Sequence, residues 1–145
     1  MTGSLEQESI TKAIRPVVEG LGFDLVAVFV ARAGRRSVVR ILADRPQGGI
    51  QLSECVQISK AASAALEGVP GTDTSYTLEV SSPGLDWHCT TLADFRRYRG
   101  QAMTLHLVDG EKVTGTLTEA GEDWLVLDTG EPIPRGQVRY GTRNY

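Results

Sequence analysis

The apolar pattern of the chain changes once, at Pro83-Gly84, and this change constrains the fold more than any other feature. Before it, helical and extended patterns alternate; after it, short extended segments follow one another with glycine turns between them. A chain of 145 residues is long enough for one ordinary domain or two very small ones. The pattern therefore predicts two domains, residues 1–87 and residues 88–145.

The first domain is expected to have the element order α-β-β-α-β. Ser4-Leu-Glu-Gln7 has a capping-box pattern and opens a helix that runs to about Leu21, with Pro16 expected to bend or shorten it. Strands are predicted at residues 23–31, 37–43 and 76–81, and a second helix at residues 52–67. The apolar or small residues that share one face of this second helix are Leu52, Val56, Ser59, Ala62 and Leu66. This order predicts helices packed on one face of a small sheet.

The second domain is expected to be a small β-barrel after one short helix. Thr91-Leu-Ala-Asp94 is a second capping-box-like start, for a helix that ends near Tyr98. Five strands are predicted at residues 102–108, 112–118, 124–127, 131–134 and 138–141. Asp109-Gly110 is a strong hairpin signal between the first two of them. The predicted fold class is thus α+β, with a two-layer domain followed by a barrel.

The stretch VSSPGLDWHC, residues 80–89, holds the side chains of nucleophilic catalysis within ten positions. Members of a Ser-His-Asp triad usually come from separate elements that converge, and no nucleophile-elbow motif is present here. Pro83 presets one backbone angle and Gly84 permits a positive one, which favours a joint between strand and linker. The large apolar residues Leu85 and Trp87 leave two alternatives open: a structural joint, or a joint that also binds a partner.

The remaining motifs predict no cofactor and no metal. Cys55 and Cys89 lack Cys-x-x-Cys spacing, and with His88 and His106 they do not show the paired spacings of a zinc site. The pairs Gly20-Leu-Gly22 and Gly48-Gly49 are expected to be turn residues rather than phosphate loops. No signal peptide or membrane span is evident, so a soluble cytoplasmic chain without membrane contact is the default expectation.

Charge points toward a basic partner. The formal net charge is −3, whereas a general nucleic-acid binder is usually basic. An acidic body suits a basic protein, or it can carry a small basic patch. Arginines do cluster, around the first predicted hairpin and on the short helix, and the candidates for phosphate contact are Arg35, Arg36, Arg96 and Arg97. A solvated surface is the alternative interpretation of both clusters.

At this point the chain resembles a known family. YTLEVSSPGLD followed by TLADFRRYRG is similar to the signature of the bacterial ribosome maturation factor RimP family, and residues 14–26 and 46–50 resemble it as well. The resemblance implies a KH-like N-terminal domain and an Sm-like or SH3-like barrel. It also implies a non-catalytic factor that binds the free small ribosomal subunit, with ribosomal protein twelve of that subunit as a basic partner. The family usually continues Asp-Arg-Pro-Leu, where this chain has Asp86-Trp87-His88-Cys89.

The predicted function is therefore an assembly factor of the small subunit, expected to be a monomer. The residues predicted to bind its partner are Ser81, Ser82, Pro83, Gly84, Leu85 and Asp86. An Sm-like regulator that binds free RNA is one alternative, against which the net charge argues. A small hydrolase that uses Ser81 or Cys89 is the other.

Overall fold

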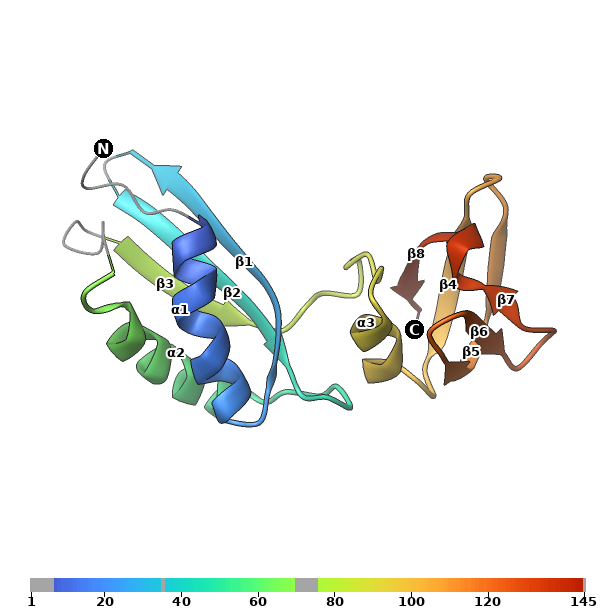
Figure 1. Ribbon diagram of the computed structural model, residues 1–145, viewed down its shortest axis with the longest axis horizontal. Coiled ribbons are helices and arrows are strands. Elements are labelled where there is room, and N and C mark those ends of the chain that lie inside the picture. Colours follow the sequence, from blue (N-terminus) through green and yellow to red (C-terminus); the bar gives the residue numbers. More distant parts are fainter. Residues whose placement is uncertain (1–6, 35, 70–75, 145) are drawn as a thin grey trace. The chain divides into compact units, whose positions relative to one another are not determined.

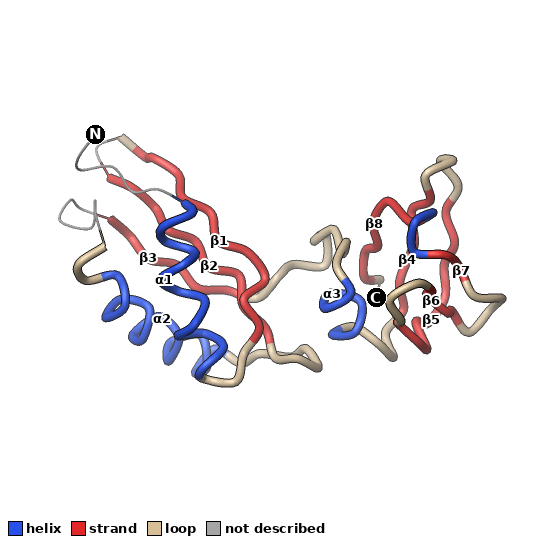
Figure 2. Tube along the Cα trace, in the orientation of Figure 1, coloured by secondary structure: helices blue, strands red, loops and turns tan. Residues whose placement is uncertain are grey.

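The computed structural model describes residues 7–34, 36–69 and 76–144 (Figures 1 and 2). The chain divides into two compact units: Met1–Arg45 with Gly49–Pro83 form unit 1, and Pro46–Gly48 with Gly84–Tyr145 form unit 2. The predicted domain bounds, residues 1–87 and 88–145, stay a prediction. The capping box expected at Ser4 lies outside the described residues.

Unit 1 contains the predicted order α-β-β-α-β around a mixed three-stranded sheet. Strands β1 (Asp24–Ala33) and β2 (Arg36–Asp44) form an antiparallel hairpin, and β3 (Tyr76–Ser81) lies parallel to β2 on its other side. The parallel pair requires a crossover, which α2 (Leu52–Leu66) supplies. Both helices cover the same face of the sheet (Figure 1).

Apolar stripes on the two helices build the core of unit 1. In α1 (Gln7–Gly20), Ile10, Ile14 and Val18 repeat every fourth residue and are fully buried against the sheet. The helix continues past Pro16 to Gly20, so Pro16 does not shorten it, and the bend that was the other expectation at this proline stays a prediction.

The apolar face identified on α2 is buried only in part. Leu52 and Val56 are exposed, at 81% and 47%, and the buried stripe is instead Cys55, Ile58, Ala62 and Leu66. Both sets of residues have helical spacing, so periodicity alone did not separate them. Ile58 packs with α1 and the central strand in one cluster, and this contact decides which face turns inward.

The turn before α2 uses the predicted glycine pair. Gly48 and Gly49 have φ of 80° and 84°, a backbone region that side chains disfavour, which confirms their role as turn residues. The buried Asp44 carboxylate accepts hydrogen bonds from the backbone N–H groups of Arg45 and Ile50, at 2.9 and 3.1 Å. The Asp44 carboxylate therefore bridges the two ends of the segment that leads from β2 into α2.

Unit 2 contains a five-stranded antiparallel sheet in the order β7-β6-β5-β4-β8. Its strands are β4 (Ala102–Leu107), β5 (Lys112–Ala120), β6 (Trp124–Leu127), β7 (Ile133–Pro134) and β8 (Val138–Arg143). All five predicted strands are present, and Asp109-Gly110 lies in the β4–β5 turn as expected. Closing this sheet into a barrel requires pairing between its two edge strands, β7 and β8. Within the described chain no such pairing is present, so closure of the predicted barrel is not observed.

The short helix α3 (Leu92–Arg97) begins with the predicted capping box. Thr91 Oγ1 accepts from the N–H of Asp94 at 3.1 Å, and the Asp94 carboxylate accepts from the N–H of Thr91 at 3.4 Å. Phe95 of this helix enters the core of unit 2. A 3₁₀ turn (Arg135–Gln137) links β7 to β8. No helix in the described ranges has the length and apolar character needed to cross a membrane.

Candidate functional site

Of the six residues predicted to bind a partner, the first three leave unit 1 at the end of β3. Ser81 pairs in register with Leu42 of β2, and its side chain and that of Ser82 are exposed. Pro83 is buried. Two hydroxyl groups are thus presented to solvent from a strand end whose backbone is held by the sheet.

Residues 84–87 form a tight turn that belongs to unit 2. The carbonyl oxygen of Gly84 accepts from the N–H of Trp87 at 3.0 Å and from Nη2 of Arg143 at 3.1 Å. A Cβ placed on Gly84 would lie 2.6 Å from Oδ1 of Asp86, so the glycine allows this carboxylate to fold back over the turn. Leu85 is half-buried, while Gly84 and Asp86 are exposed. The turn thus offers a carboxylate to solvent.

Trp87 packs against the core of unit 2. It is half-buried beside the cluster that contains Cys89 and Phe95. Its indole Nε1 is buried and has no hydrogen-bond partner within the described residues. Because the indole faces the core of unit 2, Trp87 helps to seat the turn and does not replace the charged contact of an arginine.

The four arginines predicted to contact rRNA differ in their surroundings. Arg97 is only 2% exposed, and its Nη1 lies 2.9 Å from Oδ1 of the buried Asp94. Burial argues against phosphate contact by Arg97, whereas its neighbour Arg96 is exposed. Arg36 is exposed, with Nη2 3.4 Å from the carbonyl oxygen of Tyr76, and Arg35 lies outside the described residues. Adjacent residues of a helix point about 100° apart, and for this reason Arg96 is exposed to solvent while Arg97 is buried.

A stack of three rings on unit 2 was not predicted from the sequence. The rings of His88 and Tyr140 are parallel, with centroids 3.7 Å apart, and His106 stacks on the other side at 4.2 Å. Burial, followed by the charges of Lys112, His88 and Arg139, lowers the pKa of His106. The three residues are far apart in the sequence, and strand pairing between His106 and Tyr140 brings two of them together. The register of β4 and β8 could have revealed the His106–Tyr140 pair, whereas the position of His88 follows from neither strand.

The surroundings of Cys89 do not activate it as a nucleophile. Cys89 is fully buried and exchanges two backbone hydrogen bonds with Gly141; burial, and then Asp94, raises the pKa of its thiol to about 12. Such a thiol stays protonated and unreactive at neutral pH. The ring of His88, the nearest candidate base along the chain, is stacked on Tyr140. Within the described chain, no group of three His, Cys, Asp or Glu side chains could hold a metal ion.

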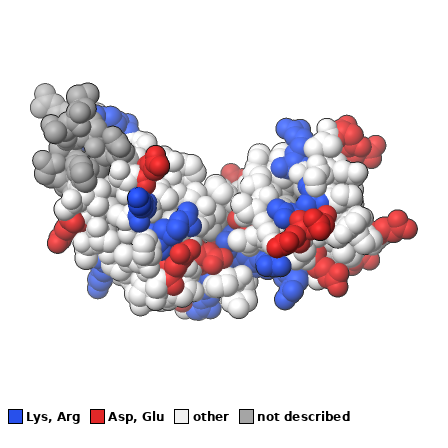
Figure 3. Space-filling model, viewed as in Figure 1, with Lys and Arg blue, Asp and Glu red and all other residues white. Residues whose placement is uncertain are grey.

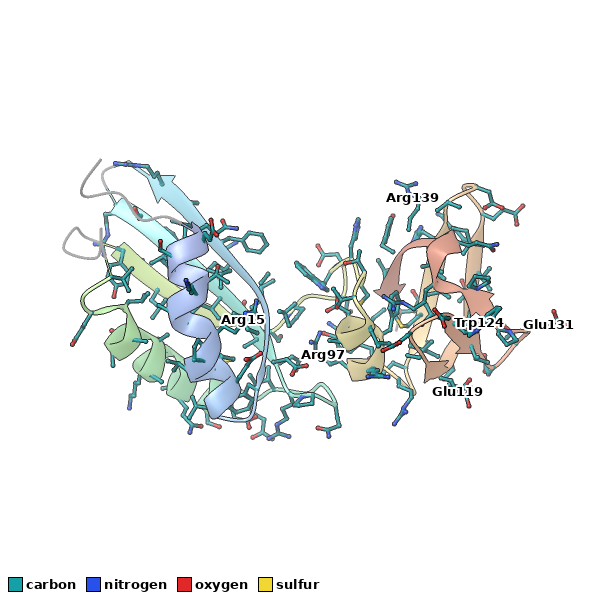
Figure 4. The ribbon with its side chains drawn as sticks, in the orientation of Figure 1. Arg15, Arg97, Glu119, Trp124, Glu131 and Arg139 are labelled. Atoms are coloured by element: carbon teal, nitrogen blue, oxygen red, sulfur yellow. The ribbon has the colours of Figure 1, made fainter. Side chains whose placement is uncertain are left out.

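A cleft of about 400 Å³ opens on the outer face of the sheet in unit 2. Its described lining residues are Glu119, Trp124, Val126, Glu131 and Pro132. Trp124 and Val126 alternate with the buried Leu125 and Leu127, so they point away from the core. Trp124 is 52% exposed. Figure 4 labels it together with Glu119 and Glu131. The cleft therefore combines an accessible indole with two carboxylates.

The part of the chain that ends in this turn also identifies the protein family. Residues 13–86, more than half of the chain, match the RimP N-terminal domain. The chain belongs to the RimP family. RimP proteins are ribosome maturation factors and act without catalysis. The catalytic interpretation of VSSPGLDWHC is therefore wrong, in agreement with the buried thiol of Cys89.

The RimP match separates the features of this chain into two groups. It includes all six residues predicted to bind a partner and ends at Asp86. The three-ring stack, Arg96 and the Trp124 cleft lie beyond it, in unit 2. Binding of the small ribosomal subunit follows from RimP membership, whereas the surface that makes the contact has to be argued from the residues.

Proposed function

We propose that this RimP-family chain promotes maturation of the free small ribosomal subunit by docking onto a basic ribosomal protein, with ribosomal protein twelve as the expected partner. The match of residues 13–86 to the RimP domain carries the proposal. The net charge of −3 supports a basic partner, since complementary potentials speed encounter and favour the correct partner. The factor is expected to act in the cytoplasm as a monomer.

The docking contact is proposed for residues 81–86. The exposed hydroxyls of Ser81 and Ser82 can hydrogen-bond to a partner, and the exposed carboxylate of Asp86 can accept from a cationic side chain. Gly84 leaves room for the Asp86 carboxylate over the turn, while Pro83 and Leu85 hold the segment in place. Arg96 and Arg36, both exposed, are the proposed rRNA backbone contacts.

Co-sedimentation tests this function. The purified chain is mixed with free small subunits, free large subunits or whole ribosomes, each at low and at physiological salt. Retention on free small subunits that survives physiological salt is the expected result. Equal retention on large subunits would overturn the proposal.

Two matched variants test the contact itself. Asp86→Asn removes one exposed negative charge and is expected to weaken retention several-fold. Asp109→Asn removes one as well, but from the β4–β5 turn, where Asn-Gly is also a favourable turn sequence. Equal loss in both variants would indicate that net charge, rather than residues 81–86, governs binding.

An RNA-binding regulator remains the second candidate, favoured by the exposed Arg96 and by the ring stack near Arg139 and Lys112. That function requires tight binding of free RNA with a steep dependence on salt. Arg96→Glu would then abolish binding, and the unaltered chain would bind RNA without any preference for small subunits. Filter binding of an unstructured RNA across a salt series distinguishes the two functions.

A further inference from the structure

We propose that the Trp124 cleft of unit 2 binds the cationic side chain of an extended, arginine- or lysine-rich segment of a protein partner. The inference deepens the proposed protein contact, and it rests on the proposed function only for the choice of a ribosomal protein as that partner. The preference for a cationic side chain is argued from the residues that line the cleft.

The arrangement of the strands brings an aromatic ring and two carboxylates to one cleft. Glu119 of β5 is paired in register with Val126 of β6, so both face the outer side of the sheet. Trp124 lies two residues before Val126 and therefore shares that face. Glu131 and Pro132 enter from the loop that leads into β7. Three separate segments thus contribute to the cleft, and Figure 4 labels three of its side chains.

This ring and these acids have no basic side chain of their own chain among the described residues that line the cleft. Residues 119–131 contain five acidic residues and no Lys or Arg. Neither Glu119 nor Glu131 forms an ion pair within the described part of the chain. Arg135 donates from Nη1 to the carbonyl oxygen of Glu122 at 2.9 Å and is not one of the described lining residues.

Acidic side chains are prominent on the surface of unit 2. In Figure 3 they are visible at its right edge and in its centre, where they lie beside Lys and Arg side chains. Figure 4 shows Glu131 at the right edge of this unit, with Trp124 and Glu119 nearer its middle. The two carboxylates of the cleft belong to a stretch of the chain with five acidic and no basic residues, a composition that attracts cations and repels the phosphates of RNA.

Among cationic groups, a guanidinium suits the cleft best. The indole of Trp is the strongest cation–π acceptor among the side chains, and Arg can lie flat on it. The same guanidinium can direct its N–H groups toward the carboxylates of Glu119 and Glu131. Val126 and Pro132 provide apolar contact for the methylene groups of a long side chain.

NMR of the full chain tests the inference, because its two indole N–H signals report on the cleft and on a control position. Trp124 lies in the cleft, whereas Trp87 packs on the core. The probe is a short Gly-Arg repeat peptide, compared with the same peptide in which citrulline replaces arginine and removes the charge. The Arg peptide is expected to shift the Trp124 signal while leaving that of Trp87 in place. An equal shift with the citrulline peptide, or none with the Arg peptide, would overturn the inference.

Matched variants localise the contact. Glu119→Gln with Glu131→Gln, and separately Trp124→Ala, are each expected to weaken binding of the Arg peptide roughly five- to tenfold. Glu111→Gln removes an exposed acid outside the cleft and should leave the affinity unchanged. Equal loss with Glu111→Gln would show attraction by net charge alone and overturn the inference.

Co-sedimentation of the same variants with small subunits separates the two proposals. If the unaltered chain is retained on small subunits while the Arg peptide does not bind, the cleft inference fails and the proposed function stands. If the peptide binds as expected but no preference for small subunits exists, the cleft is upheld as a cation site and the proposed function fails.

Discussion

Unit 1 is held together by aliphatic stripes, whereas unit 2 places a buried ion pair and aromatic rings beside its apolar core. In unit 1, Ile10, Ile14 and Val18 of one helix and Ile58 of the other meet the sheet in one cluster. In unit 2, Asp94 and Arg97 are buried together at 2.9 Å, and the guanidinium of Arg143 lies 4.0 Å from the ring centroid of Tyr98. An apolar core tolerates substitutions that keep its volume nearly constant. A buried ion pair, in contrast, destabilises the fold when either partner is removed alone.

The two tryptophans make this comparison measurable. Trp87 and Trp124 both lie in unit 2, so their fluorescence reports on that unit. The long helices α1 and α2 belong to unit 1 and contribute most of the helical circular dichroism. Urea unfolding followed by both signals can therefore assign the effect of each substitution to a unit.

The largest effect is expected from Asp94→Ala. The substitution leaves the buried guanidinium of Arg97 without its carboxylate, which costs about 4 kcal/mol of unfolding free energy when a buried pair is broken. The midpoint of the fluorescence transition should fall sharply. Adding Arg97→Met to this variant should restore much of the loss, since it removes the buried charge that the Asp94 carboxylate contacts in the unaltered chain. No recovery in the double variant would contradict the assignment.

A cavity in unit 1 should have the next largest effect. Ile58→Ala removes a fully buried side chain between α2 and the sheet, at a cost of about 3 kcal/mol. The circular dichroism transition should move to lower urea. Val56→Ala, on the outer face of the same helix and 47% exposed, serves as the control and should change the midpoint little. A larger loss from Val56→Ala would restore the face first predicted for α2.

Overpacking in unit 2 should be milder. A Cβ on Gly141 would lie 2.9 Å from Cε1 of Phe95, so Gly141→Ala is expected to cost about 2 kcal/mol in the fluorescence transition. Gly136 has no atom within 4 Å of the equivalent position, and Gly136→Ala is the matched control. Equal stability of the two variants would show that the neighbours of Gly141 move aside freely.

The smallest effect concerns pH. The pKa of His106 is lowered in the folded chain by burial and then by nearby positive charges, so the unfolded chain binds this proton more readily. Stability of unit 2 should therefore be complete above about pH 6.5 and fall as the pH drops below that value. Both histidines lie in unit 2, so the fluorescence midpoint should decrease from pH 7 to pH 6 while the circular dichroism midpoint stays constant. Replacing His106 with Gln should remove part of the decrease.

Local patterns determined most of the secondary structure. The five strands of unit 2, the hairpin of unit 1 and the capping box at Thr91 follow from alternation, turn residues and short-range hydrogen bonding, all of which act between near neighbours. The family resemblance is also visible in the sequence, because its motif at residues 81–86 is contiguous. For the same reason, the sequence by itself identifies the segment proposed to bind a partner.

Contacts between distant residues were decided only by the tertiary structure. The inward face of α2, the burial of Arg97 and the stack of His88, Tyr140 and His106 depend on which elements pack together and in which register. The Trp124 cleft has the same origin, because Glu119 and Glu131 reach the indole from segments on either side of β6. Spacing along a chain restricts which residues share a face, but only packing against the rest of the fold selects the face that is buried.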